Sequence, residues 1–179
     1  MPKHHPIARR LAGLAGAAVL AVTGLSAMPS PALAADYVEK CHQNSLDPLD
    51  LPNKTDLKVS PTTCVYRNGA YTYARIKVMW SPDDEYPWGS GHKFDDFEVV
   101  VNLERRVNGD SEDRVVIQKT CDFTDEINAS WDGYKFCTTG KTTYDSAYDW
   151  SGDGYLRYDK DNDGKGASLR FLTGSPLLK

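Results

Sequence analysis

The sequence predicts an all-β protein: a disulfide-stapled antiparallel β-sandwich of Ig-like type that follows a cleaved signal peptide. Three observations favour this fold. Long segments alternate between apolar and polar residues, turn sequences separate these segments, and four cysteines follow a leader-like N-terminus. No segment shows a convincing helical period. The spacing of Cys, Trp and Cys in immunoglobulin domains is absent, so the prediction concerns the architecture and not the family.

Residues 1–34 have the features of a secretory signal peptide. Lys3, Arg9 and Arg10 supply positive charge, residues 11–28 are apolar, and Ala32-Leu33-Ala34 fits a cleavage site. We expect general secretion with cleavage after Ala34, which makes the protein a bacterial extracellular one. A retained membrane anchor is the alternative. No later apolar run is long enough to span a bilayer, so no membrane insertion is expected.

Charge argues against one class of partner. Without Lys3, Arg9 and Arg10, the 21 basic residues fall to 18 against 25 acidic ones, so the mature chain carries a net charge of −7. An acidic protein is repelled by phosphate backbones, and we expect no nucleic-acid partner.

The four cysteines predict two disulfides, because their number is even and the compartment is oxidising. Sequence alone allows three pairings. Short loops close at the lowest entropic cost, which favours Cys41–Cys64 and Cys121–Cys137. A zinc site or a nucleophilic thiol is the competing interpretation, and no C-x-x-C spacing supports it.

Residues 35–69 predict an extended arm rich in Pro and Asp. Pro48, Pro52 and Pro61 interrupt it, and each restricts the residue that precedes it to extended conformations. Residues 70–179 are then expected to form a single β-sandwich domain. Such an arm would suit strand exchange with a partner's sheet edge, or it would dock on its own domain.

The first strand of the predicted domain is the clearest. Between residues 71 and 80, Thr72, Ala74, Ile76, Val78 and Trp80 share one face, and polar or larger residues share the other. Asn108-Gly109-Asp110 predicts a hairpin turn. The remaining predicted strands are 97–104, 114–119, 131–138, 155–158 and 168–172.

One motif indicates a metal. Asp159, Asp161 and Asp163 alternate before Gly164 and resemble the first half of a calcium-binding loop. Residues 149–154 have a similar form. The Glu at position twelve of such loops is replaced here by Lys160 and Arg170. Asp, Asn and Gly are also typical of hairpin turns, so a turn is the alternative to calcium. No other cofactor is expected.

An aromatic and acidic cluster predicts a binding surface. The candidate binding residues are Trp88, Tyr144, Tyr148, Trp150 and Tyr155. Aromatic faces beside carboxylates suit sugar stacking or a protein-binding patch. Packing at the rim of the sandwich is the alternative.

The predicted function is binding and not catalysis. Neither a G-x-S-x-G nor an H-E-x-x-H motif is present, and we assign no catalytic residue. We expect a secreted adaptor subunit that acts in trans on a secreted or cell-surface protein, such as a small component of a toxin-like extracellular complex. A polysaccharide is the alternative partner. A small secreted hydrolase or enzyme inhibitor is the third hypothesis.

Overall fold

The computed structural model describes residues 36–89 and 91–179. These residues belong to one compact unit that begins at Ala34. The expected signal peptide, residues 1–34, lies outside the described residues. Within the described ranges, no helix has the length and apolarity that crossing a membrane requires.

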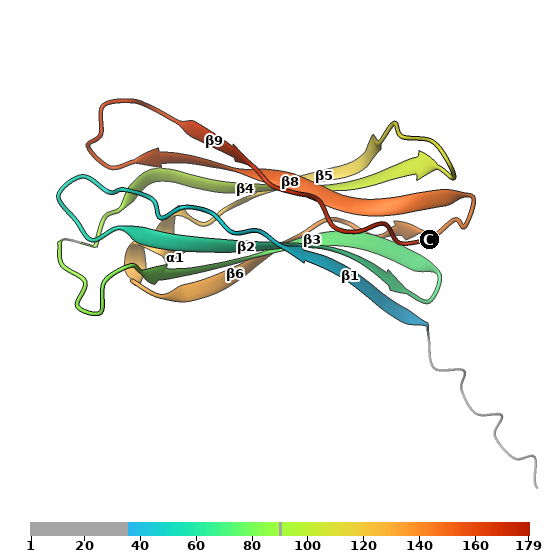
Figure 1. Ribbon diagram of the computed structural model, residues 1–179, viewed down its shortest axis with the longest axis horizontal. Helices are drawn as coiled ribbons and strands as arrows, with labels where there is room; N and C mark the ends of the chain where they lie inside the picture. The colour runs from blue at the N-terminus through green and yellow to red at the C-terminus, as the bar shows by residue number, and fades with distance from the viewer. Residues whose placement is uncertain (1–35, 90) are drawn as a thin grey trace, which may run out of the picture. The chain divides into compact units, whose positions relative to one another are not determined.

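The unit is built from two antiparallel β-sheets that lie face to face (Figure 1). Sheet A has the strand order β1-β2-β3-β6, with the short β7 also paired to β3, and sheet B has the order β5-β4-β8-β9. The elements are β1 (Tyr37–Gln43), β2 (Leu57–Asn68), β3 (Tyr71–Pro82), β4 (Phe94–Val107), β5 (Arg114–Asp122), α1 (Thr124–Ala129), β6 (Gly133–Thr138), β7 (Thr142–Thr143), β8 (Tyr148–Lys160) and β9 (Ser168–Phe171). The all-β architecture with sandwich-like packing is therefore as predicted.

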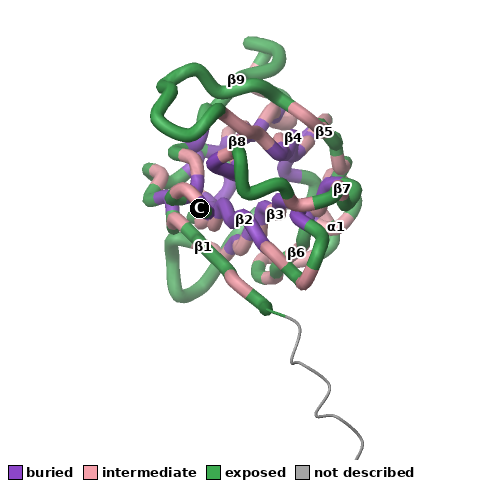
Figure 2. Tube along the Cα trace, turned by 90° about the vertical axis from the view of Figure 1, so that its right-hand side faces the viewer, coloured by how far each residue is buried: buried purple, intermediate pink, exposed green. Residues whose placement is uncertain are grey.

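The core lies between the sheets, where the buried residues in Figure 2 concentrate. Strand β3 shows why. Its alternate residues Ala74, Ile76 and Val78 are fully buried, and the residues between them face outward. Phe97, Val99, Val101 and Leu103 of β4 supply the opposing layer. The alternation in the sequence thus identifies which face of each sheet meets the other.

Residues 35–69 are not an arm, which corrects the prediction. They supply β1 and β2, and β2 pairs with β3 over its whole length. Pro61 is tolerated inside β2 because its position coincides with the end of β1. The Pro61 carbonyl accepts a hydrogen bond from Asn44 N, which shows that the polar backbone groups of Pro61 point toward β1. The pairing of β1 ends at Gln43, so the N–H that proline lacks would point to the sheet edge beyond that residue. The polar residues of β2 conceal its alternation in the sequence.

The structure also contains a short helix that the sequence did not predict. Helix α1 spans six residues and buries only Ile127, which is too little for a periodic signal. Its C-terminal end is held by Lys93, a side chain 1% exposed. Lys93 Nζ donates to the carbonyl oxygens of Ile127 (2.8 Å) and Ser130 (3.1 Å) and lies 4.5 Å from the Trp131 ring centroid. Burial, with a contribution from Lys54, lowers the pKa of Lys93 to about 8.

Both predicted disulfides are present. Cys41 and Cys64 stand opposite each other across β1 and β2, with their Cα atoms 4.1 Å apart. Cys121 of β5 is bonded to Cys137 of β6, so the second disulfide joins sheet B to sheet A. All four cysteines are paired, which is the pattern of an oxidising, extracellular environment.

The two sheets approach each other closely at Gly152 of β8. A Cβ atom at this position would lie 2.5 Å from the Cys64 carbonyl oxygen and 3.2 Å from Ala74 Cβ. Gly154 is similarly confined by Val100 and Ile76. The second Asp-rich segment, residues 149–154, is therefore part of a central strand and not a calcium-type loop or turn.

The C-terminal tail continues the edge of sheet B. The backbones of Trp150 and Leu178 exchange hydrogen bonds of 2.9 and 2.8 Å, and Ser175 N donates to the Gly152 carbonyl. Asn44 connects this tail to sheet A. Its Oδ1 accepts from Thr173 N at 2.7 Å and its Nδ2 donates to the Thr173 carbonyl at 3.2 Å. Asn44 thus pairs with Thr173 as a neighbouring strand would.

Gly152→Ala should destabilise the fold by about 1–3 kcal/mol, because the neighbouring atoms are backbone and cannot move aside. Gly140→Ala is the matched control, since the closest atom to its Cβ would be 3.9 Å away. Urea unfolding of both variants measures the difference. Equal midpoints for the two variants would contradict the close approach of the sheets.

Candidate functional site

The outer face of sheet A carries the most distinctive surface of the described residues. Inward residues of β3 build the core, so Tyr73, Arg75, Lys77 and Met79 must face outward. The register places the outward residues of β2 and β6 beside them. Tyr66 lies opposite Tyr73.

On this surface, cations lie over aromatic rings. Tyr66 and Tyr73 stack with centroids 4.9 Å apart. The Arg75 guanidinium carbon is 5.1 Å from the Tyr66 ring centroid and 5.1 Å from that of Phe136. Lys77 Nζ lies 5.2 Å from the Tyr134 ring centroid. We call these six residues the aromatic face: Tyr66, Tyr73, Arg75, Lys77, Tyr134 and Phe136.

The aromatic face is open to solvent on the side of β6. Tyr134 is 61% exposed and Phe136 is 47% exposed, an unusual degree for neighbouring large rings. Their rings meet edge to face at 5.6 Å. Arg75 and Lys77 lie over these rings, and such cation–π contacts favour the observed ring positions.

A groove of about 390 Å³ extends the aromatic face toward the other end of β6. Its lining residues include Tyr134, Met79, Ser60, Lys58 and Asp132. Gly133 is required here, because a Cβ atom would lie 2.6 Å from the Trp80 ring. The groove is open enough to accept a side chain from another molecule.

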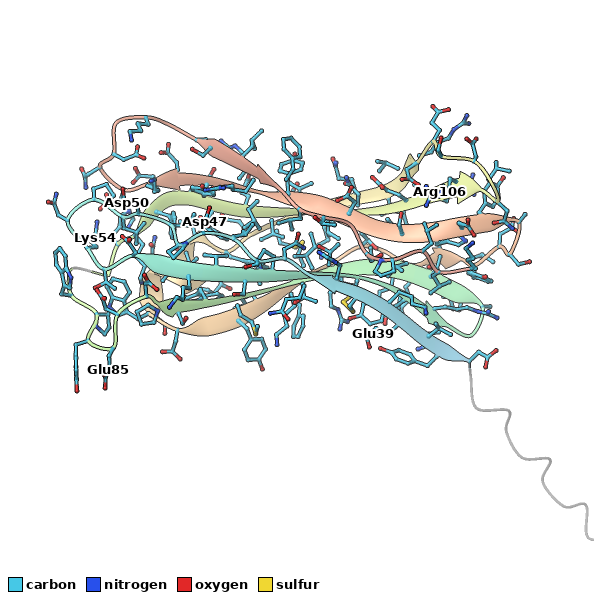
Figure 3. The ribbon with its side chains drawn as sticks, in the orientation of Figure 1. Glu39, Asp47, Asp50, Lys54, Glu85 and Arg106 are labelled. Atoms are coloured by element: carbon cyan, nitrogen blue, oxygen red, sulfur yellow. A yellow bond between two sulfur atoms is a disulfide. The ribbon has the colours of Figure 1, made fainter. Side chains whose placement is uncertain are left out.

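The titration behaviour of the aromatic face is governed by burial. Burial raises the pKa of Tyr66, and the Glu39 carboxylate raises it further, so the Tyr66 phenol stays neutral. Glu39, labelled in Figure 3, reaches it from β1, the neighbouring strand of sheet A. The charged groups beside the rings are thus the Glu39 carboxylate and three cations, Arg75, Lys77 and Lys141, of which Lys141 Nζ lies 5.7 Å from the Tyr73 ring centroid.

Three of the candidate binding residues belong to one end of the core. Trp150 is 1% exposed, and its Nε1 donates to the Asp145 carbonyl at 3.0 Å. Tyr144 and Tyr148 pack near it, with ring centroids at 6.5 and 6.4 Å. Burial leaves Trp150 no ring face for a ligand. Trp150 is part of the core, and Tyr144 and Tyr148, both partly buried, pack against it.

The other two candidates lie elsewhere. Trp88 is 56% exposed in the loop between β3 and β4, where its backbone N–H donates to Thr55 Oγ1. Tyr155 lies on the outer face of sheet B beside Phe171, with centroids 5.6 Å apart. The structure therefore does not bring the five candidates together.

The acidic motif is found at the turn that follows β8. Lys54 Nζ lies 2.7 Å from Asp161 Oδ2 and lowers the pKa of this carboxyl. Asp163 Oδ1 accepts from Lys165 N at 2.8 Å, as in an Asx turn. Asp159 is still within β8. A lysine side chain and a backbone N–H thus contact Asp161 and Asp163, and these contacts favour the turn over a calcium site.

One cluster of possible metal-ligand atoms includes Asp161 of this motif. The ligand atoms of His92, Asp95 and Asp161 lie within 4.8 Å of one another. Asp161 is already engaged by Lys54, and His92 Nε2 is 3.3 Å from Asp95 Oδ1. These contacts pair the carboxylates with cationic or donor groups inside the chain.

Calcium should leave the melting temperature unchanged, because the Lys54 ammonium already occupies Asp161. Thermal unfolding in millimolar calcium is compared with unfolding in a chelator. A melting temperature that rises with calcium concentration would show a bound ion, by the linkage between ligand binding and stability.

Sheet B has a polar cleft on its outer face. Its volume is about 370 Å³. Glu104 and Arg106 of β4, Ser151 and Asp153 of β8, and Ser175 of the tail line it. Asp153 and Glu104 are diagonal neighbours on the same face, because the Glu104 position is opposite Ser151.

Two carboxyl groups of this cleft, those of Glu104 and Asp153, have raised pKa values. Burial raises the pKa of Glu104 to about 7, and the negative charges of Asp153 and Asp113 add to the effect. Burial also raises the pKa of Asp153. The cleft is thus lined by three acidic residues, Glu104, Asp113 and Asp153, against one basic residue, Arg106.

Glu104→Gln should increase stability at high pH. In the unfolded chain Glu104 ionises near 4.5, and in the folded chain near 7. Its contribution to stability is therefore present below pH 4.5 and is lost as pH rises through about 7. Relative to wild type, the variant should gain roughly 1–2 kcal/mol between about pH 5 and about pH 8.5.

Urea unfolding of the two proteins across this pH range measures the gain. Glu85→Gln, on an exposed loop, is the matched control and should show none. Parallel stability profiles for wild type and Glu104→Gln would contradict the raised pKa.

Sequence reasoning missed both surfaces for one reason. It recognised the outward residues of β3 as a set but could not pair them with Tyr66 and Phe136, which come from distant segments. The signal that was available is the alternation in β6, where Tyr134 and Phe136 share one face of the strand and Lys135, between them, points to the other.

Comparison with known proteins adds no assignment: no family model, curated protein or solved structure matches this chain.

Proposed function

We propose that this protein is a secreted, non-catalytic binding subunit, exported with cleavage after Ala34, that acts in trans on a protein partner. It holds an acidic segment of that partner on its aromatic face. The observation that carries the proposal is the arrangement of exposed Tyr134 and Phe136 beside Arg75 and Lys77. The Ig-like description of the sandwich belongs to the same proposal.

The composition of the aromatic face supports a protein partner. Tyrosine, phenylalanine and arginine are the residue types that concentrate binding energy in protein interfaces, and lysine is depleted there unless it meets an opposite charge. The adjoining groove offers a recess for an anchoring side chain. Arg75 presents a planar donor group suited to a carboxylate.

The charge of the whole chain supports an acidic segment at this surface. The chain is acidic, yet the groups that protrude between the rings are cationic. An acidic segment is attracted to this face and repelled by the carboxylates of sheet B, which would orient the partner on approach.

The exposed rings do not favour a polysaccharide equally. Tyr134 and Phe136 are inclined by 76°, whereas stacking along a sugar chain uses ring faces presented in parallel. The parallel pair is Tyr66 and Tyr73, and both are buried at 5% and 8% exposure. A protein partner is therefore the better match.

The double variant Arg75→Ala/Phe136→Ala should weaken partner binding by at least about tenfold, because it removes the cation and an exposed ring of the same contact. Tagged mature protein is used to capture its partner from the culture supernatant of the source organism, followed by titration of that partner. Tyr86→Ala is the control, since Tyr86 is 81% exposed but lies on the loop outside this face.

Binding should also weaken as salt increases, because the contact pairs exposed charges. Unchanged capture by the double variant would remove the aromatic face from the proposal. Retention on chitin, cellulose or peptidoglycan that the double variant abolishes would replace the protein partner with a polysaccharide.

A further inference from the structure

The polar cleft of sheet B is separate from the aromatic face. It lies on the outer side of sheet B, whereas the aromatic face lies on the outer side of sheet A. Strands β4 and β8 form its floor, and residues 174–177 of the tail form one wall. Its volume of about 370 Å³ falls within the range of small-ligand sites.

One buried polar atom of this cleft has no hydrogen-bond partner among the described residues, and it is Arg106 Nε. Ser151, which is 6% exposed, also lines the cleft. The distance from Arg106 Nε to Asp113 Oδ1 is 3.7 Å, which is too long for a hydrogen bond. Figure 3 shows Arg106 near the end of β4.

Unpaired buried donors are costly, so they indicate what a ligand must supply. Arg106 Nε–H can only donate, and it requires an oxygen acceptor. The Ser151 hydroxyl can donate or accept. A ligand that places an oxygen atom near Arg106 Nε would remove this penalty, and a second oxygen could pair with Ser151.

The charge of the cleft selects the other part of the ligand. Glu104, Asp153 and Asp113 bring three carboxylates, against the single cation of Arg106. An anion would be repelled. A metal ion is also a poor match, because the cleft carboxylates are not among the described groups whose ligand atoms gather within 4.8 Å. An organic cation with its own hydrogen-bond donors suits carboxylates that stand further apart.

We propose that this cleft binds a small organic ammonium compound that carries oxygen atoms next to its nitrogen, the chemistry shared by amino sugars and free amino acids. The ammonium group lies between Glu104 and Asp153. The neighbouring hydroxyl or carboxylate oxygens accept from Arg106 Nε and pair with Ser151.

The proposal implies a pH dependence. The groups that face Glu104 are Asp153 on β8, Asp113 in the turn between β4 and β5, and Arg106 and Asn102 on its own strand. Residues 174–177 of the tail carry no charged side chain. Binding of an ammonium group favours the ionised form of Glu104. Affinity should therefore rise as pH increases from about 5.5 to about 7, and binding should release protons.

Amide NMR titration of the purified protein tests the site with three probes: D-glucosamine, L-serine and D-glucose. We expect saturable shifts at Ser151, Asp153 and Ser175 with glucosamine, with serine, or with both, and none with glucose, which lacks the ammonium group. The probe that binds more tightly identifies the source of the ligand. Saturable binding of glucose with equal affinity, or no saturation by either ammonium compound, would overturn the proposal.

Variants decide whether the carboxylates are responsible. Glu104→Gln and Asp153→Asn should each weaken binding at least about tenfold, whereas Glu85→Gln should bind as wild type does. Well-dispersed amide spectra show that the variants are folded. Wild-type affinity in both cleft variants would overturn the assignment. Failure of the partner capture described above would leave these results unaffected, because the aromatic face is not involved.

Discussion

The contact between Gly152 and the backbone of Cys64 is the constraint on which the arrangement of the two sheets depends. It brings a central strand of sheet B against a central strand of sheet A with no side chain between them. The same β2 strand is tied to β1 by the disulfide, and the same Gly152 backbone binds Ser175 of the tail. The packing of the two sheets, the attachment of β1 and the docking of the tail thus all involve residues at or next to Gly152. A methyl group on Gly152 would therefore disturb all three.

Close packing inside the sandwich leaves binding to the outer faces, and these two faces differ in chemistry. Sheet A presents aromatic rings with Arg75 and Lys77, and sheet B presents carboxylates such as Glu104 and Asp153. A net negative charge for the chain conceals this separation. Because the alternation of a strand assigns every second residue to the outside, one set of strands builds both the core and the two surfaces.

The sequence predicted those features that depend on local spacing. Loop length favoured Cys41–Cys64 and Cys121–Cys137 among three possible pairings, since both partners in each pair lie close in the chain. Strict alternation predicted β3, and Asn108-Gly109 predicted the turn between β4 and β5, where Gly109 has a φ of 87°. Local rules failed at β2, whose inward positions include Pro61 and Thr63, and at α1, which is shorter than two helical turns.

By itself, the sequence determined the all-β class and the inward face of β3, and it favoured the disulfide pairing that the structure shows, because each follows from neighbours along the chain. Tertiary structure alone decided that Trp150 belongs to the core, that Lys54 engages Asp161 from 107 residues away, and that Arg75 meets Phe136. The physical reason is that periodicity tells which side of a strand a residue faces. It does not tell which distant strand lies beside it, and binding surfaces are made from that second relationship.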